Sequence, residues 1–125
     1  MKANSTCSYK DLIVWQKAIE LGKLIYQLTK TFPSEEKFGL VAQMRRAVVS
    51  IPSNIAEGYG RAGRREYLQF LSVVQGSLKE LETQTILAQK LAYVTSSQAE
   101  RVLSESEVVG KMLGSLIRSL KAKDE

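Results

Sequence analysis

The sequence predicts an all-α fold, an antiparallel up-down-up-down bundle of four helices. Apolar residues recur at spacings of three and four along most of the 125 residues, as on the buried face of a helix. Short turn signals divide this pattern into four segments, and such short connections make consecutive helices antiparallel neighbours. No segment has the two-residue period of a strand. We expect one domain over residues 9–121, between a flexible segment 1–8 and a frayed tail 122–125.

The first predicted helix covers about residues 11–31 and ends before Pro33, because a proline pushes the preceding residue out of the helical region. Its apolar stripe is wider than one partner helix would cover. Two series form the stripe: Leu12, Trp15, Ile19, Gly22, Tyr26 and Thr29, and Val14, Ala18, Leu21, Ile25, Leu28 and Phe32. Together with a similar excess on the third helix, this width predicts an interface between subunits, the alternative being a thick core.

The second predicted helix begins at Ser34, which caps it. Glu35 and Glu36 lie in its first turn, where carboxylates complement the helix dipole. The helix continues to about Glu57. Glycines then supply the left-handed and extended conformations that end it: Gly58, Gly60 and Gly63.

Pro52 interrupts this second helix. A proline inside a helix removes one backbone hydrogen bond and clashes with the carbonyl four residues earlier, here that of Val48, at a cost of about 3 kcal/mol. The apolar spacing nevertheless continues on both sides of it. The helix must therefore bend at Pro52 or restart there with the proline in a first turn, and we expect a kink.

The third predicted helix runs from Arg64 to about Ala92, with Gly63 as its cap. Its middle contains Gly76 and Ser77, whose small size is expected to permit close contact with another helix rather than to form a hinge.

The fourth predicted helix begins at a capping box and ends near Lys121. Thr95 with Gln98 and Ser97 with Glu100 are equally good candidates for this box.

The positive charge is unevenly distributed along the chain. The formal net charge is +5, and the stretch from Lys37 to Arg65 contains a single acid, Glu57. Widening this stretch by a few residues on either side adds further acids and lowers its excess. Such a patch can attract an anionic partner, nucleic acid first, or form a solvated face balanced by nearby acids. Its basic residues are Lys37, Arg45, Arg46, Arg61, Arg64 and Arg65.

The residue types argue against an enzyme. The chain contains no histidine, the commonest general acid and base. Cys7 is the only cysteine, so neither an intrachain disulfide nor a cysteine zinc site can form. No strand precedes the glycines and no Gly-Lys-Ser/Thr follows them, so they are not a phosphate loop. We expect no catalytic site, no metal and no cofactor.

The N-terminal residues lack the hydrophobic core of a signal peptide. No apolar run approaches the roughly 20 residues of a membrane span. These observations predict a cytoplasmic protein without membrane association.

The candidate nucleic-acid contacts lie on both sides of the proline-containing segment. Arg64 and Arg65 occupy the first two positions of a predicted helix, where cations oppose the helix dipole. A bound phosphate would turn this cost into a gain, because backbone amides, dipole and guanidiniums would converge on it. Alternatively, these arginines pair with Glu57 or with an acid of a neighbouring subunit. The remaining candidates are Arg45, Arg46 and Arg61.

The segment between the arginines contains candidate structural residues. Asn54 and Glu57 lie on one helical face, where they could bind the carbonyl released by Pro52 or hold the glycine-rich loop. Gly58 begins that loop. Tyr59, beside the arginines, is a candidate for stacking on a nucleic-acid base.

These residues resemble those of a known family. The run Ser-Ile-Pro-Ser-Asn-Ile-Ala-Glu-Gly at 50–58, with Gln-Met-Arg-Arg-Ala at 43–47 and Gly-Ser-Leu-Lys-Glu-Leu at 76–81, resembles proteins encoded within intervening sequences of bacterial large-subunit ribosomal RNA genes. The resemblance spans residues 9–117 and implies a four-helix bundle that assembles into a homopentameric ring. The chain is also similar to the accessory variability determinant of diversity-generating retroelements, a basic pentamer that binds nucleic acid and a reverse transcriptase.

The leading hypothesis is therefore a non-enzymatic oligomeric protein, pentameric as the resemblance implies, whose arginine-rich surface contacts phosphates of RNA or DNA. A reverse transcriptase or another protein acting on RNA or DNA is a candidate partner. The alternative is a structural oligomer or protein-interaction adaptor with no nucleic-acid role.

Overall fold

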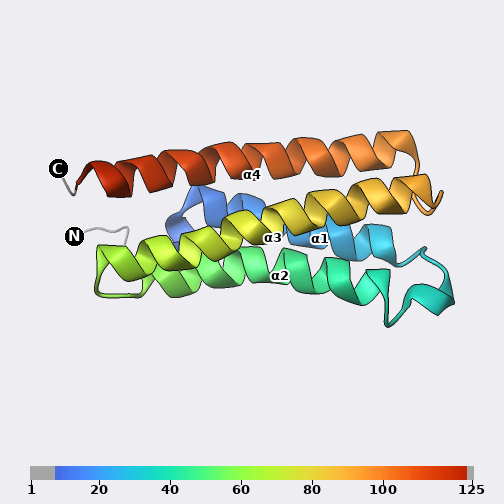
Figure 1. Ribbon diagram of the computed structural model, residues 1–125, viewed down its shortest axis with the longest axis horizontal. Helices are drawn as coiled ribbons and strands as arrows, with labels where there is room; N and C mark the ends of the chain where they lie inside the picture. Colours follow the sequence, from blue (N-terminus) through green and yellow to red (C-terminus); the bar gives the residue numbers. More distant parts are fainter. Residues whose placement is uncertain (1–7, 124–125) are drawn as a thin grey trace.

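The computed structural model describes residues 8–123, which form four long helices (Figure 1). The helices are α1 (Ile13–Thr29), α2 (Leu40–Tyr59), α3 (Arg64–Lys90) and α4 (Ser96–Ala122), with short 3-10 turns η1 (Tyr9–Asp11) and η2 (Ser34–Glu36). No strand occurs among these residues. The predicted all-α four-helix bundle is confirmed.

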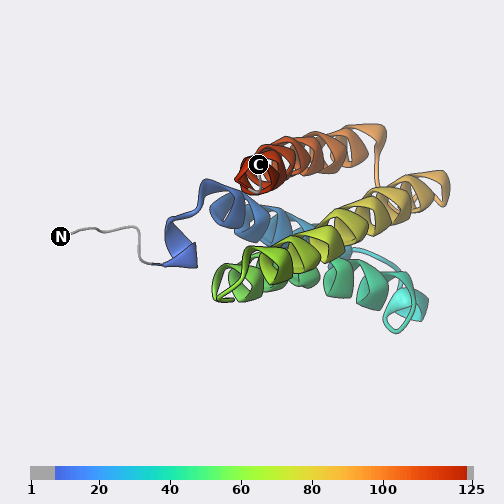
Figure 2. The ribbon, with the colours of Figure 1, turned by 60° about the vertical axis from the view of Figure 1, so that its left-hand side comes forward.

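Each helix is antiparallel to the next, and α4 returns beside α1 (Figure 1). The turned view shows α3 lying along α2, with α4 beside α1 and α3 (Figure 2). The start of α1, the α2–α3 loop and the end of α4 lie at one end of the bundle, and the other two connections lie at the opposite end (Figure 1). The described residues leave out most of the predicted flexible segment 1–8, including Cys7. They also leave out Asp124 and Glu125 of the predicted frayed tail, whereas Ala122, its first residue, is the last residue of α4.

The core is built from one buried stripe per helix. Of the two apolar series on α1, the series from Val14 to Phe32 is buried throughout. The other series faces α2 and remains partly open, with Ile19 and Tyr26 exposed. The largest fully buried side chains come from all four helices: Leu21, Ile25, Met44, Ile51, Ile55, Leu71, Leu81 and Leu113.

The start of α2 differs from the prediction. Ser34 begins the 3-10 turn η2 and does not cap α2, which starts six residues later at Leu40. Gly39, with φ −104° and ψ −112°, separates the two elements. Glu36 still serves the helix, but from outside it, because its Oε1 accepts a hydrogen bond from the Leu40 amide at 3.0 Å.

Glu36 also joins the two connections at this end of the bundle. The Tyr93 hydroxyl, in the α3–α4 turn, donates to Glu36 Oε2 at 2.8 Å. The Leu40 amide first, and the Tyr93 hydroxyl second, stabilise the carboxylate and lower the pKa of Glu36 below its ordinary value of 4.5. Gly39 leaves room for this carboxylate, since a Cβ there would lie 2.7 Å from Oε1.

The α2 helix is continuous through Pro52, so a restart at that residue is excluded. The bend itself stays a prediction. The Asn54 side chain does not reach the carbonyl of Val48. Its Nδ2 donates to the Ser50 carbonyl at 2.8 Å and to Ser50 Oγ at 3.0 Å, which reinforces the turn that contains the proline.

Close packing of α2 against α3 depends on small residues. A Cβ at Gly58 would lie 2.8 Å from Phe70 Cβ and 2.9 Å from Tyr67 Cδ1, so only glycine fits. Farther along, Ser50 Oγ and Ser77 Oγ share a hydrogen bond of 2.9 Å. Ser77 thus makes the close contact expected of it, whereas Gly76 is exposed.

The glycines of the α2–α3 loop do not use the left-handed conformation. No described glycine has a positive φ. Gly58 lies inside α2, Gly60 is in the right-handed region, and only Gly63 is extended as predicted. The expectation of left-handed glycines was therefore wrong, because the loop is tight enough to turn with ordinary dihedral angles.

The boundaries of α3 and α4 match the prediction closely. The α3 helix starts at Arg64 and ends at Lys90, two residues before Ala92, which adopts φ 64°. Thr95 forms the capping box of α4: its hydroxyl accepts from the Gln98 amide, and the Gln98 side chain accepts from the Thr95 amide.

The contact at Gly58 predicts the effect of a single methyl group. Alanine favours a helix over glycine by about 1 kcal/mol, but the clash with the Phe70 and Tyr67 side chains should cost about 1–3 kcal/mol. We expect Gly58→Ala to lower the free energy of unfolding in urea, by up to about 2 kcal/mol. Gly76→Ala is the matched control, since a Cβ there meets nothing within 4 Å, and it should stabilise the protein. Equal stabilisation by both substitutions would contradict this packing account.

Glu36 predicts a component of acid sensitivity. A carboxyl group whose folded pKa is lowered stabilises the protein above its unfolded pKa, and this stabilisation is lost as the pH falls through the folded pKa. The thermal midpoint of the wild type should therefore fall more steeply below about pH 4.5 than that of Glu36→Gln. Tyr93→Phe should show an intermediate slope, and identical slopes for all three proteins would contradict the assignment.

Candidate nucleic-acid interface

The five candidate arginines do not form one cluster. Arg46 lies 13 residues before Tyr59, the last residue of α2. At 1.5 Å per residue this separates Arg45 and Arg46 from the α2–α3 loop by about 20 Å. The predicted patch, continuous in sequence, is therefore two sites in space.

Arg45 is held against α1. Its Nε donates to Thr29 Oγ1 at 3.0 Å and its Nη2 to the Tyr26 carbonyl at 3.3 Å, and its guanidinium carbon lies 4.4 Å from the Tyr26 ring centroid. The last turn of α1 has no basic residue of its own. Arg45 supplies the cation that complements the dipole at this C-terminus, which is a structural role. Arg46, the next residue, is exposed.

Arg61 is engaged within the α2–α3 loop. Its Nη2 forms an ion pair with Glu57 Oε2 at 3.0 Å, and its guanidinium carbon lies 4.8 Å from the Phe70 ring centroid. Glu57 thus holds the glycine-rich loop, which was one of the two structural roles predicted for it. Its partner is Arg61, on the loop itself.

Arg64 and Arg65 begin α3 as predicted. Gly63 is the N-cap, with an extended backbone, and no side chain forms a capping hydrogen bond. Arg64 is half-buried and Arg65 is exposed, and Glu66 is the acid of the first turn. The helix start therefore presents guanidinium groups beside a positive dipole end, the arrangement that an anion would stabilise.

Tyr59 is only partly accessible. Its ring packs edge-on against Tyr67, with 6.2 Å between the centroids. Burial, with a smaller contribution from Tyr59, raises the pKa of Tyr67. Tyr59 therefore contributes to the α2–α3 contact, and its stacking on a base stays a prediction.

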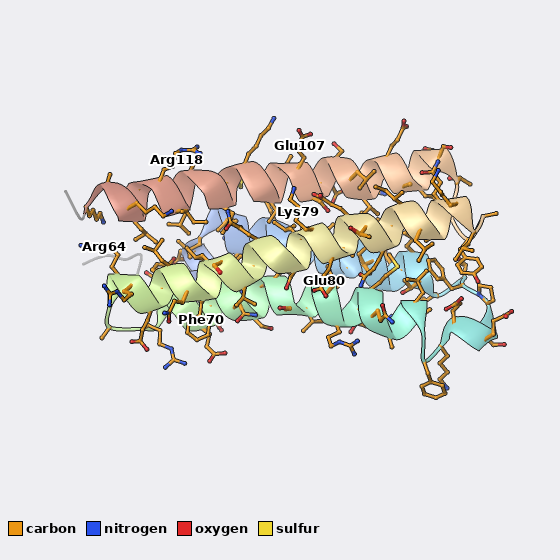
Figure 3. The ribbon with its side chains drawn as sticks, in the orientation of Figure 1. Arg64, Phe70, Lys79, Glu80, Glu107 and Arg118 are labelled. Atoms are coloured by element: carbon orange, nitrogen blue, oxygen red, sulfur yellow. The ribbon has the colours of Figure 1, made fainter. Side chains whose placement is uncertain are left out.

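The fold adds basic residues that the sequence analysis did not select. The end of α4 lies at the same end of the bundle as the α2–α3 loop, and Figure 3 shows Arg118 and Arg64 in this region. We define the basic end as residues 8–11, 57–66 and 118–123. It contains three acids and seven basic residues: Lys10, Arg61, Arg64, Arg65, Arg118, Lys121 and Lys123. Asp124 and Glu125 follow in the sequence but lie outside the described residues.

The opposite end is neutral by comparison. Residues 30–39 and 90–100 contain three basic and three acidic residues, against an excess of four cations at the basic end. The predicted topology could have shown that the cations at the end of α4 join those of the α2–α3 loop. In an up-down-up-down bundle the end of the fourth helix must lie beside the loop between the second and third.

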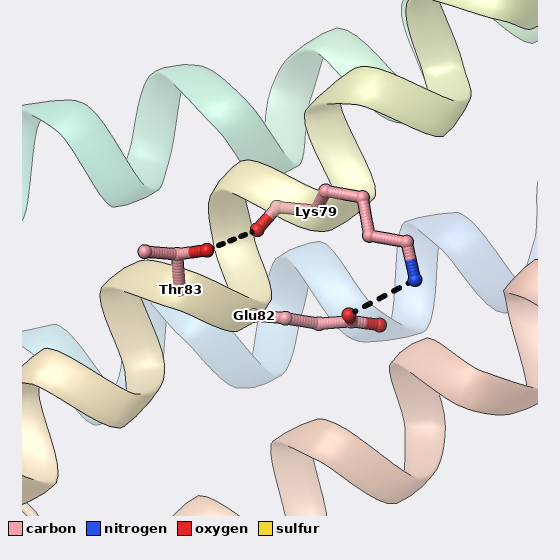
Figure 4. Close-up of polar contacts among 3 residues, drawn as sticks. All are labelled: Lys79, Glu82 and Thr83. Carbon is pink, nitrogen blue, oxygen red and sulfur yellow. Dashed lines mark hydrogen bonds and ion pairs between the residues drawn. The ribbon is translucent and has the colours of Figure 1, made fainter.

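Two lysines on the α3–α4 face are paired within their own helices. On the α3–α4 face, Lys79 Nζ lies 3.5 Å from Glu82 Oε1, and Thr83 Oγ1 donates to the Lys79 carbonyl at 2.8 Å (Figure 4). Lys111 pairs with Glu107 at 3.9 Å on α4. The basic end differs from this face in its excess of cations and not in the pairing of its arginines, since Arg61 also pairs with Glu57.

One side of the bundle carries an apolar groove. The α1–α2 groove has a volume of about 420 Å³ and is lined by Trp15, Ile19, Gly22, Tyr26, Val49 and Pro52, among others. Ile19, Tyr26 and Val49 remain exposed there. The wide stripe predicted on the first helix is thus real and is not fully covered by the single chain.

Two further properties concern residues 8–123 alone. Within this range no three or more His, Cys, Asp or Glu side chains are grouped so that they could hold a metal ion. No helix in it is long and apolar enough to span a membrane.

Comparison with known proteins identifies the family. Residues 10–115 match the family described as 23S rRNA-intervening sequence protein. A crystal structure from Bacteroides thetaiotaomicron, of a protein with unknown function from the S23 ribosomal protein family, is similar with a TM-score of 0.78 and 26% identity. The match covers 84% of this chain and 98% of that one. No curated protein matches the sequence. The chain therefore belongs to the 23S rRNA-intervening sequence protein family.

Proposed function

We propose that the protein is a non-enzymatic homo-oligomer that binds RNA or DNA through the phosphates at its basic end. The concentration of positive charge at that end, drawn from three separate segments of the chain, is the observation that carries the proposal. A nucleic-acid backbone is the anion that such a surface suits, because it presents many phosphates at regular spacing.

The contacts available there favour affinity over sequence selectivity. Arginine guanidiniums bind phosphate oxygens in a forked geometry, and an uncapped helix start adds backbone amides and a dipole. Such contacts position a nucleic acid without reading its bases. A protein partner that acts on RNA or DNA, such as a reverse transcriptase, would then supply selectivity or chemistry.

The α1–α2 groove supports the homo-oligomeric part of the proposal. Exposed apolar side chains that line a groove are typical of surfaces covered by another protein. A second copy of the chain is the proposed cover, and the family resemblance implies five copies in a ring.

The alternative function is a structural oligomer or adaptor with no nucleic-acid role. The contacts of Arg45 with α1 and of Arg61 with Glu57 favour it, because both arginines already have structural partners. Under this alternative, the arginines at the start of α3 would form ion pairs between subunits.

The double variant Arg64→Ala with Arg65→Ala tests the phosphate contacts. We expect it to weaken binding to unrelated sequences by similar factors, because the lost contacts are to the backbone. The slope of log affinity against log salt should fall by about one unit per lost contact, measured by filter binding with single-stranded and duplex probes.

The matched control removes the same charge from the neutral end, as Lys30→Ala with Lys90→Ala, because both lysines are exposed there. This variant should keep most of the wild-type affinity and its salt slope. Unchanged affinity of the arginine variant would overturn the basic end as the binding site. Dissociation of the oligomer in sedimentation, without a change in binding per subunit, would favour the alternative function.

A charge placed in the α1–α2 groove tests the assembly. Val49→Asp puts a carboxylate on the proposed interface, and the cost of burying it should shift the wild-type oligomer to monomers in light scattering after gel filtration. Val108→Asp is the control, since Val108 is similarly exposed but lies on α4. A monomeric wild type, or an unchanged oligomer in Val49→Asp, would contradict the proposed interface.

A further inference from the structure

Phe38 is the most exposed large apolar side chain in the described range. It lies between η2 and α2 and is 88% exposed. Burying a phenyl ring would stabilise the protein by about 2 kcal/mol relative to leaving it in water. An exposed side chain of this kind is therefore typical of a surface that another protein covers.

The segment that presents Phe38 is held in place. Glu36, two residues earlier, is bound to the Leu40 amide at 3.0 Å and to the Tyr93 hydroxyl at 2.8 Å. The Lys37 ammonium lies 5.5 Å from the Phe38 ring centroid, so one face of the ring is partly occupied. A preorganised apolar side chain loses less conformational entropy on binding than one on a loose loop.

The α1–α2 groove has the size and lining for an aromatic ring. Its volume of about 420 Å³ exceeds the roughly 150 Å³ of a cavity that holds benzene. Gly22 leaves open space in its wall, since a Cβ there would meet nothing within 4 Å. Tyr26 and Trp15 offer rings for edge-to-face contact.

Both signs of charge lie beside Phe38: the Lys37 ammonium lies over its ring, and Glu35 complements the cation beside the groove. Glu35, three residues before Phe38, is exposed. Arg46 is exposed on the same face of α2 as Val49 and Ser53, which line the groove three and seven residues later. An acid near the apolar side chain and a cation near the groove would attract each other when the two surfaces meet.

We infer that Phe38 of one copy of the chain inserts into the α1–α2 groove of a second copy, with Glu35 facing Arg46. The inference rests on the proposed homo-oligomer and names the residues that join its subunits. Because the side chain and the groove are different surfaces of one chain, the contact either repeats head-to-tail around a ring or occurs twice in a reciprocal pair.

Phe38→Ser tests the inserted side chain. Loss of an aromatic anchor from an interface should raise the concentration at which the oligomer half-dissociates at least about tenfold, measured by sedimentation. The far-ultraviolet circular dichroism should be unchanged, because the side chain is exposed in the single chain. Phe38→Tyr should retain most of the association, and Val108→Ser, which removes an exposed apolar side chain from α4, is the matched control.

A disulfide between chains tests where Phe38 goes. In a Cys7→Ser background, a chain with Phe38→Cys is mixed with a differently tagged chain with Gly22→Cys, and oxidation should link the two tags. Gly110→Cys replaces Gly22→Cys in the control, because Gly110 is also a helical glycine with open space but lines the α3–α4 face. The control pair should remain mostly unlinked.

The outcomes separate this inference from the proposed function. An oligomeric wild type with unchanged association of Phe38→Ser overturns the inserted side chain and leaves the proposed assembly standing. Linking through Gly110 in preference to Gly22 overturns the groove as its site. A monomeric wild type overturns the assembly and the inference together, whereas loss of nucleic-acid binding in the arginine variant bears on the basic end alone.

Discussion

The close approach of α2 and α3 is the constraint on which the rest of the structure depends. Gly58 lets the end of α2 pack directly against Phe70 and Tyr67, and the hydrogen bond between Ser50 and Ser77 fixes how the two helices are aligned. The same packing places Phe70 beneath the Arg61 guanidinium. A side chain at position 58 would push the helices apart at the point where the loop, with its arginines, leaves α2.

Local signals predicted most of the fold but not the distribution of the arginines. The start at Arg64 was correct, and one of the two equally good capping boxes, Thr95 with Gln98, is the one that forms, because each depends on a few neighbouring residues. The start of α2 was misplaced, and one of the two partners of the Glu36 carboxylate, Tyr93, lies 57 residues away, beyond the reach of a local signal. Similarly, net charge along the sequence could not distinguish Arg45, which is stacked on Tyr26, from an exposed cation, since that difference arises from tertiary contacts.

The two ends of the bundle differ in kind, and this suggests a division of roles along its length. One end gathers cations from η1, the α2–α3 loop and α4, where charge acts over several ångströms and is sensitive to salt. The other end carries Phe38 on a segment held by Glu36, where short-range packing dominates. Association between copies would then depend on Phe38 and the α1–α2 groove, and contact with a polyanion on the arginines, although the groove reaches Tyr9 within the basic end.

An antiparallel bundle with an even number of helices returns the chain to the end from which it started. The start of α1 and the end of α4 consequently lie at the same end as the α2–α3 loop (Figure 1). Any domain joined genetically before α1 or after α4 would be tethered next to Arg64 and Arg65, at a high effective concentration near whatever they hold. An affinity tag placed there is for the same reason a poor choice for binding measurements unless it is removed.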